Sequence, residues 1–111
     1  MSKGYLTTHV LDTATGTPAV GLKIELFSAG QLIASKVTNT DGRTDGAILP
    51  AEAFALGEYE LVFHAGDYLR GAGLKGGFLD IIPIRFTMDQ EDHYHVPLLL
   101  SPFGYSTYRG S

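Results

Sequence analysis

Two histidines, one arginine and the carboxyl end of the chain are the groups in this 111-residue sequence that could carry out hydrolysis. His9 lies near the amino end, Arg43 lies in a polar segment, His95 lies near the carboxyl end, and the chain closes with YSTYRGS at 105–111. A histidine near its ordinary pKa of about 6.5 accepts a proton from water, and an arginine stabilises the oxyanion that forms on an attacked carbonyl. These groups would suffice without a thiol, and the sequence contains no cysteine.

His9 and His95 occupy the polar faces of two predicted β-strands. In YLTTHVLD at 5–12 and in HYHVPLLL at 93–100, apolar residues alternate with polar ones, and both histidines fall on the polar side. The apolar side of such a strand faces the core of its own domain. Both imidazoles are therefore expected to point away from that core.

The elements that must position these groups are short strands joined by turns. Residues 22–28 and 32–38 alternate in polarity around the turn AGQ, which predicts a hairpin. The same alternation predicts strands over 58–64 and 82–88, and the aromatic and β-branched end at 105–111 favours a final strand.

Turn and helix signals lie between these strands. TNTDGRTDG at 38–46 predicts a loop with Arg43 at or near its tip, and PAEAFALG at 50–57 can hold one helical turn. Asp67 could cap a short helix. Pro97 cannot donate a ladder hydrogen bond, so it predicts that its strand is an edge or bulged strand.

Composition limits the fold and the partners. Fourteen glycines, five prolines, 44% hydrophobic and 18% charged residues indicate one globular all-β domain over 1–111, a β-sandwich with a small barrel as the alternative. A net charge of −4 with dispersed bases argues against nucleic acid. No apolar run has the length of about 18 residues that a membrane span needs, and no signal peptide is evident, so a cytoplasmic protein without a membrane partner is expected.

A site on the outer face of a sheet would be fully hydrated unless something covers it. Hydrated groups shift their pKa little and stabilise charge weakly. A sandwich of this size has little interior for a substrate, so the simplest cover is the same sheet of another copy of the chain. The sequence therefore predicts a site between subunits.

Simpler interpretations exist for several of these residues. Any single outward histidine can be a solvated surface group, which is the interpretation kept for His64 and His93. A zinc ion between His9 and His95, or a hard cation at DQEDH at 89–93, is a third interpretation, but no clear third zinc ligand is present. No metal and no cofactor are expected.

The motifs of this chain resemble those of the 5-hydroxyisourate hydrolases, the transthyretin-related family of urate degradation. The resemblance covers most of the chain and rests on five stretches: LTTHVLDTATGTPA at 6–19, TNTDGRTDG at 38–46, YELVFHAGDY at 59–68, FLDIIPIRF at 78–86 and YHVPLLLSPFGYSTYRGS at 94–111. It implies a transthyretin-like sandwich of two four-stranded sheets with one short helix. It also implies a homotetramer whose sites lie at the dimer–dimer interface.

The resemblance further implies the reaction and the residues of the site. The activity would be hydrolysis of 5-hydroxyisourate to 2-oxo-4-hydroxy-4-carboxy-5-ureidoimidazoline in purine catabolism, without a cofactor. The implied catalytic residues are His9, Arg43 and His95; the implied substrate-binding residues are His9, Arg43, Tyr108, Arg109, Gly110 and Ser111. The alternative is a non-catalytic carrier of a small ligand, because the carrier transthyretin shares the fold. Transthyretin lacks the YRGS ending, so the resemblance favours the hydrolase.

Overall fold

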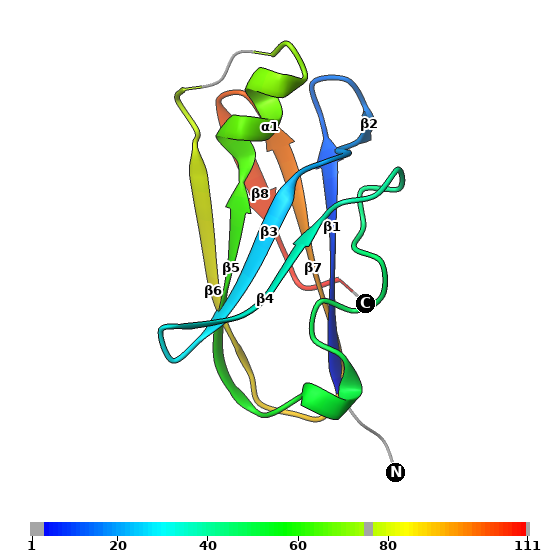
Figure 1. Ribbon diagram of the computed structural model, residues 1–111, viewed down its shortest axis with the longest axis vertical. Helices are drawn as coiled ribbons and strands as arrows, with labels where there is room; N and C mark the ends of the chain where they lie inside the picture. Colours follow the sequence, from blue (N-terminus) through cyan, green and yellow to red (C-terminus); the bar gives the residue numbers. More distant parts are fainter. Residues whose placement is uncertain (1–3, 75–76, 111) are drawn as a thin grey trace.

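The strands of the chain form two four-stranded sheets that pack face to face (Figure 1). The computed structural model describes residues 4–74 and 77–110. Within that part the order is β2–β1–β7–β8 in one sheet and β4–β3–β5–β6 in the other. The strand bounds are β1 (Tyr5–Asp12), β2 (Thr17–Pro18), β3 (Lys23–Ser28), β4 (Gln31–Val37), β5 (Gly57–His64), β6 (Ile81–Met88), β7 (His93–Ser101) and β8 (Gly104–Thr107).

The predicted β-sandwich is confirmed, but the final strand predicted over 105–111 is shorter and ends at Thr107. β3 and β4 pair antiparallel as the expected hairpin, and β5 and β6 extend the same sheet. In the other sheet β1 and β7 run parallel, and β2 and β8 flank them antiparallel. The pairing of β1 with β7 joins segments from opposite ends of the chain, which the alternation of residues alone does not specify.

The core lies between the sheets and consists of the apolar side of each strand. Six of its fully buried side chains, three from each sheet, are Leu6, Val10, Leu98, Ile24, Leu61 and Phe63. Burying each such side chain contributes about 1.5–3 kcal/mol. Because side chains alternate along a strand, the burial of one face leaves the neighbouring residues of β1 and β7 on the outer face.

The short helix α1 (Ala65–Gly71) caps one end of the sandwich, directly after β5 (Figure 1). It begins two residues before Asp67, so the expectation that this residue caps it was wrong: Asp67 lies in the first turn and pairs with Arg70 at 2.9 Å. The expected single turn within 50–57 is the 3-10 helix η1 (Ala51–Ala53). In the described part of the chain, no helix has the length and apolarity to cross a membrane.

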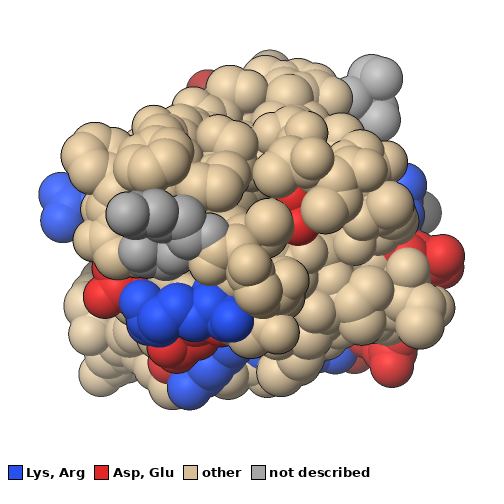
Figure 2. All heavy atoms as spheres, turned by 90° about the horizontal axis from the view of Figure 1, so that it is seen from above, with Lys and Arg blue, Asp and Glu red and all other residues tan. Residues whose placement is uncertain are grey.

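The surface at the α1 end carries charges of both signs. Figure 2 views the molecule from this end, and blue and red atoms lie beside each other around a mostly uncharged face. On α1 the guanidinium of Arg70 lies 2.9 Å from Asp67 and 3.6 Å from Asp80. The described atoms of this face therefore do not form the extended basic surface that binds nucleic acid.

Pro97 lies in a central strand whose register is not shifted on either side, so the prediction of an edge or bulged strand was wrong. β7 has β1 on one side and β8 on the other. The pairing with β8 stops at Leu98 and Thr107 and resumes in the same register at His95 and Gly110. Pro97 falls inside this gap, where its missing N–H removes a ladder bond, and its carbonyl instead accepts a hydrogen bond from the Thr107 hydroxyl at 2.8 Å.

A buried carboxylate joins α1 to the end of β1. The side chain of Asp12 accepts hydrogen bonds from the Tyr68 hydroxyl at 2.7 Å and from the backbone N–H of Ala14 at 3.0 Å, and the residue is 1% exposed. Burial, and next the bond to Asp12, raise the pKa of Tyr68 to about 12. The neutral phenol is thus the form that the folded state stabilises.

We expect replacement of Tyr68 by Phe to destabilise the protein by about 1.5–3 kcal/mol at pH 8, the usual range for a hydrogen bond to a charged group. In the unfolded chain the phenol ionises near pH 10, whereas in the folded chain it stays neutral until about pH 12. This stabilisation is therefore complete below pH 10 and is lost as the pH rises toward 12. Urea unfolding at pH 8 and pH 11 should show that the gap between wild type and variant narrows at pH 11.

Replacement of Tyr105, which is 45% exposed, by Phe is the matched control. It should change the free energy of unfolding little at either pH. A Tyr68→Phe gap that is equally large at pH 8 and pH 11 would contradict this account of the Asp12 contact.

Candidate active site

The outer face of the β1–β7 pair carries the predicted chemistry. In the parallel register Tyr5 pairs with His93 and Thr7 pairs with His95, while His9 follows two residues farther along β1. The imidazole rings of His9 and His95 are stacked with centroids 6.5 Å apart and an interplanar angle of 26°. The prediction that both histidines point away from the core is confirmed, because each is half-buried and the residues on either side of it are buried.

Arg43 reaches the same face because its loop runs along β1. The backbone of Arg43 forms a bridge with that of His9, and the N–H of Val10 donates to the Gly42 carbonyl at 2.8 Å. The side chain of Asn39 accepts from the Arg43 N–H at 3.2 Å and closes the turn. The loop is therefore fastened to the strand that carries His9.

Gly42 makes this close approach possible. Its φ is +75°, and a Cβ atom on it would lie 2.5 Å from the carbonyl oxygen of Val10. Any other residue would be strained by the backbone conformation and would collide with β1. The glycine that precedes Arg43 therefore allows the loop to lie directly against β1.

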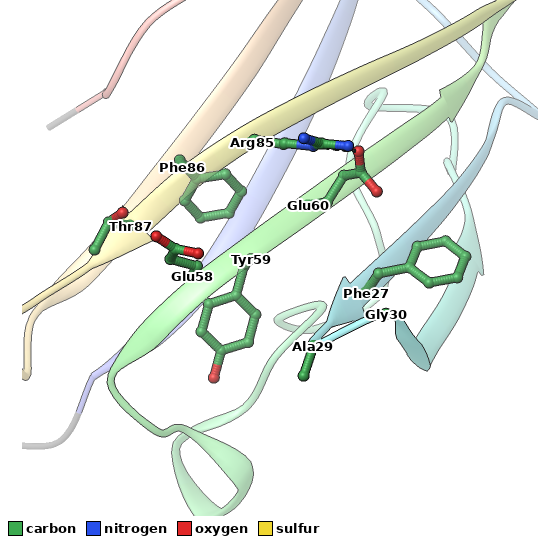
Figure 3. A pocket seen from close by; sticks show the side chains of 9 residues that line it. All are labelled: Phe27, Ala29, Gly30, Glu58, Tyr59, Glu60, Arg85, Phe86 and Thr87. Carbon is green, nitrogen blue, oxygen red and sulfur yellow. Dashed lines mark hydrogen bonds and ion pairs between the residues drawn. The ribbon is translucent and has the colours of Figure 1, made fainter.

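A hollow of about 450 Å³ lies beside Arg43 and His95 and is lined by Tyr5, Thr7, Thr8, Arg43, Thr44, Gly46, Ala47, His93 and His95. His9 is not among its lining residues, although its ring is stacked on that of His95. A larger hollow of about 530 Å³ lies on the other sheet and contains Glu58, Glu60 and Arg85. Figure 3 shows that Arg85 and Glu60 point toward one another, and their ion pair measures 3.1 Å. Of these two hollows, only the first is lined by histidine together with arginine, and in the second the Arg85 cation is already paired with the Glu60 carboxylate.

Both histidines of the site are biased toward the neutral form. Burial and then the charge of Arg43 lower the pKa of His9, and Asp41 partly opposes the shift. Burial, Arg43, His93 and His9, in that order, lower the pKa of His95. Both imidazoles therefore remain available as proton acceptors below the pH at which a free histidine is half-protonated.

Thr7 and His93 belong to the site but were missed by the sequence reasoning. The Thr7 hydroxyl lies 2.8 Å from Nδ1 of His95 and 2.7 Å from Nε2 of His93, whose ring is stacked on that of Tyr5. The interpretation of His93 as a solvated surface histidine was therefore wrong. The two histidines of HYH, which are two positions apart and so lie on the same strand face, were the available signal.

The carboxyl end touches the site through Gly110. Its N–H donates to the His95 carbonyl at 2.7 Å, and a Cβ on Gly110 would lie 2.6 Å from Cδ2 of the His95 ring. One edge of the ring thus faces Gly110 and the opposite edge faces Thr7. The segment and β1 hold the imidazole between them.

The neighbours of Gly110 lie elsewhere. The guanidinium of Arg109 donates to Asp92 at 3.1 Å and lies 4.2 Å above the ring of Tyr94. Tyr108 and Arg109 line a separate hollow of about 240 Å³ between β6 and β8. Within this chain neither side chain lines the hollow over His95, and the predicted site residue Ser111 lies outside the described residues.

The residues that the structure describes bring together no group of three or more histidine, aspartate or glutamate side chains suited to a metal ion. His64, the remaining histidine, lies on the outer face of the other sheet, where its Nε2 is 2.6 Å from Glu25. The stacked imidazoles of His9 and His95, whose pKa values are lowered and which lie beside the Arg43 loop, are suited to proton transfer.

Known proteins share both the sequence and the fold. A 5-hydroxyisourate hydrolase of Rhizobium meliloti (strain 1021) is 60% identical over the full length of both chains. The solved 5-hydroxyisourate hydrolase of Klebsiella pneumoniae superposes with a TM-score of 0.87 at 37% identity, and the match covers 100% of this chain and 97% of that one. An (S)-allantoin synthase structure superposes with a TM-score of 0.91 at 45% identity, and 99% of this chain spans 44% of that protein.

The family model described as the HIUase/Transthyretin family matches residues 6–110, which hold both strands and the loop that build the site. The resemblance seen in the sequence motifs is therefore confirmed, and so is the transthyretin-like sandwich. This chain belongs to the HIUase/Transthyretin family.

Proposed function

We propose that this protein hydrolyses 5-hydroxyisourate to 2-oxo-4-hydroxy-4-carboxy-5-ureidoimidazoline. Water attacks a ring carbonyl of the substrate, a carbon–oxygen bond forms, the adjacent carbon–nitrogen bond breaks, and the ring nitrogen receives a proton. The observation that carries the proposal is the stacked pair of His9 and His95, 6.5 Å apart, beside the loop of Arg43. A relative that is 60% identical over its full length is named a 5-hydroxyisourate hydrolase, which supports this choice of substrate.

His9, His95 and Arg43 have different roles in the proposed reaction. His9 and His95 share the removal of a proton from water and its delivery to the leaving nitrogen, because each is neutral at neutral pH and lies on the same face. Arg43 binds the substrate carbonyl and stabilises the negative charge that develops on its oxygen. Water is the nucleophile and the substrate carbonyl is already activated, so the proposed mechanism uses no cofactor.

The carboxyl end orders the site rather than reacting. Gly110 packs on the His95 ring, and the contacts of Arg109 with Asp92 and Tyr94 anchor the segment. Tyr108 is 58% exposed and does not line the hollow over His95 of its own chain. From the family resemblance, we propose that Tyr108 and Ser111 contribute to the wall of the substrate pocket between subunits. The site is completed between subunits of a homotetramer, at the dimer–dimer interface, because the hollow on one chain is open and its groups are only half-buried.

We expect His9→Ala and His95→Ala each to lower turnover by about 10²- to 10⁴-fold, the usual contribution of a general acid or base. The substrate decays unaided, so the assay compares freshly generated substrate with and without protein. His64→Ala, on the outer face of the other sheet, is the matched control and should keep wild-type turnover.

A wild-type protein that gives no acceleration over the spontaneous rate would end the hydrolase proposal. Binding of an aromatic ligand that survives both histidine replacements would then support the carrier alternative. Light scattering on the same samples reports assembly, and a fully active monomer would contradict a site shared between subunits.

We expect kcat/KM to fall at acid pH with a midpoint below pH 6.5, the pKa of a free histidine. Both histidines must be neutral to accept a proton, and their lowered pKa keeps them neutral below the value of a free histidine. The check is a pH–rate profile of wild type and of Arg43→Gln. In Arg43→Gln the cation that lowers both pKa values is gone, so the midpoint of the acid limb should move to higher pH. A wild-type midpoint at or above pH 6.5 would contradict the role of His9 and His95 as bases with lowered pKa.

We expect Gly110→Ala to lower kcat by about 100-fold, because the added Cβ lies 2.6 Å from the His95 ring and displaces a catalytic group. Deletion of residues 108–111 should have at least the same effect. Gly104→Ala is the control in the same terminal segment, since its Cβ would lie 3.7 Å from the nearest atom, the Ser101 hydroxyl oxygen. Full activity of the truncated chain would show that the end of the chain has no role in ordering His95.

A further inference from the structure

One side chain on the site has two histidine contacts and no part in the mechanism above. Thr7 Oγ1 lies 2.8 Å from His95 Nδ1 and 2.7 Å from His93 Nε2, so it bridges the two rings. Both distances are those of good hydrogen bonds. Thr7 and His95 are direct partners in the β1–β7 register, which fixes the bridge to the backbone.

A hydroxyl carries one proton, so the bridge couples the two rings. When Thr7 donates to His93, it must accept from His95, and the His95 proton then sits on Nδ1. When Thr7 donates to His95, His93 must donate to it, and the His95 proton then sits on Nε2. The first arrangement leaves Nε2 of His95 free to accept a proton, and the second one does not.

We propose that Thr7 is a positioning residue which, with His93 as the acceptor of its hydroxyl proton, keeps the His95 proton on Nδ1 and leaves Nε2 as the base. This inference rests on the proposed function, because activation of water at His95 requires an unprotonated nitrogen. His93 acts one contact farther out and decides the direction in which the Thr7 hydroxyl points.

The surroundings hold both rings in the orientation that the bridge needs. The Tyr5 ring is stacked on His93 with centroids 4.2 Å apart and an interplanar angle of 8°. Gly110 faces Cδ2 of His95, at the edge away from Thr7. A rotation of the His95 ring that exchanged Nδ1 and Cδ2 would lose the Thr7 contact, so the nitrogen available for chemistry is Nε2.

The first test is the tautomer of His95 in the free protein. Selective ¹⁵N-histidine labelling and two-bond ¹H–¹⁵N correlation spectra at pH 8 report which nitrogen is protonated. We expect Nδ1–H in wild type and in Thr7→Ser, and a shift toward Nε2–H in Thr7→Val and in His93→Phe. His93→Phe keeps an aromatic ring for Tyr5 but frees the Thr7 hydroxyl to donate to His95.

The second test is turnover of the same variants. Thr7→Val and His93→Phe should each lower kcat by about 10- to 100-fold, as loss of a partner that orients a catalytic imidazole does, with KM changed less than about twofold. Thr7→Ser, which keeps the hydroxyl, should keep kcat within about threefold of wild type. The double variant should lose no more than Thr7→Val alone, because both changes break one bridge.

The outcomes separate this inference from the hydrolase proposal. An active wild type whose His95 carries its proton on Nε2, or a Thr7→Val protein with wild-type kcat, overturns the positioning role and leaves the hydrolase standing. An inactive wild type with an Nδ1–H tautomer that is lost in Thr7→Val ends the hydrolase proposal but retains the bridge. If Thr7→Val does not fold, the tautomer and kcat of His93→Phe decide the question.

Discussion

The parallel pairing of β1 with β7 is the contact on which the site depends. It joins two strands from opposite ends of the chain and fixes which outward side chains become neighbours: Tyr5 with His93 and Thr7 with His95. A slip of one residue would turn Thr7 and His9 toward the core and Leu6 toward solvent, at the cost of the burial that holds the sheets together. The energy of the core therefore specifies the geometry of the outer face.

The loop and the tail that complete the site are fastened to this pair by backbone contacts. Gly42 lies close enough to the Val10 carbonyl that the loop has no room for a Cβ, and Gly110 lies equally close to the His95 ring. Both glycines remove side chains where two segments meet. As a result Arg43 and the imidazoles are positioned by main-chain atoms of a rigid sheet, which holds their relative geometry more closely than flexible side chains would.

Alternation along the strands was enough to predict the sandwich and the outward faces of His9 and His95, because burial follows a period of two. It did not predict the Thr7 bridge, since the contacting residues are 86 and 88 positions apart and only the strand register brings them together. Pro97 misled the reasoning for a related reason. A proline is excluded from a central strand only where the neighbouring strand would need its missing N–H. β8 ends opposite Leu98, one residue before it would reach Pro97.

The gap that Pro97 makes gives the tail a local stability separate from that of the sandwich. Beyond Thr107 the described residues are held by the Gly110 N–H and by the contacts of Arg109, with a break between them and β8. A segment with so few bonds opens at a free energy far below that of global unfolding. Since the register continues across the break, each reclosure returns Gly110 to His95, so the end of the chain can exchange with solvent often and still rebuild the same site.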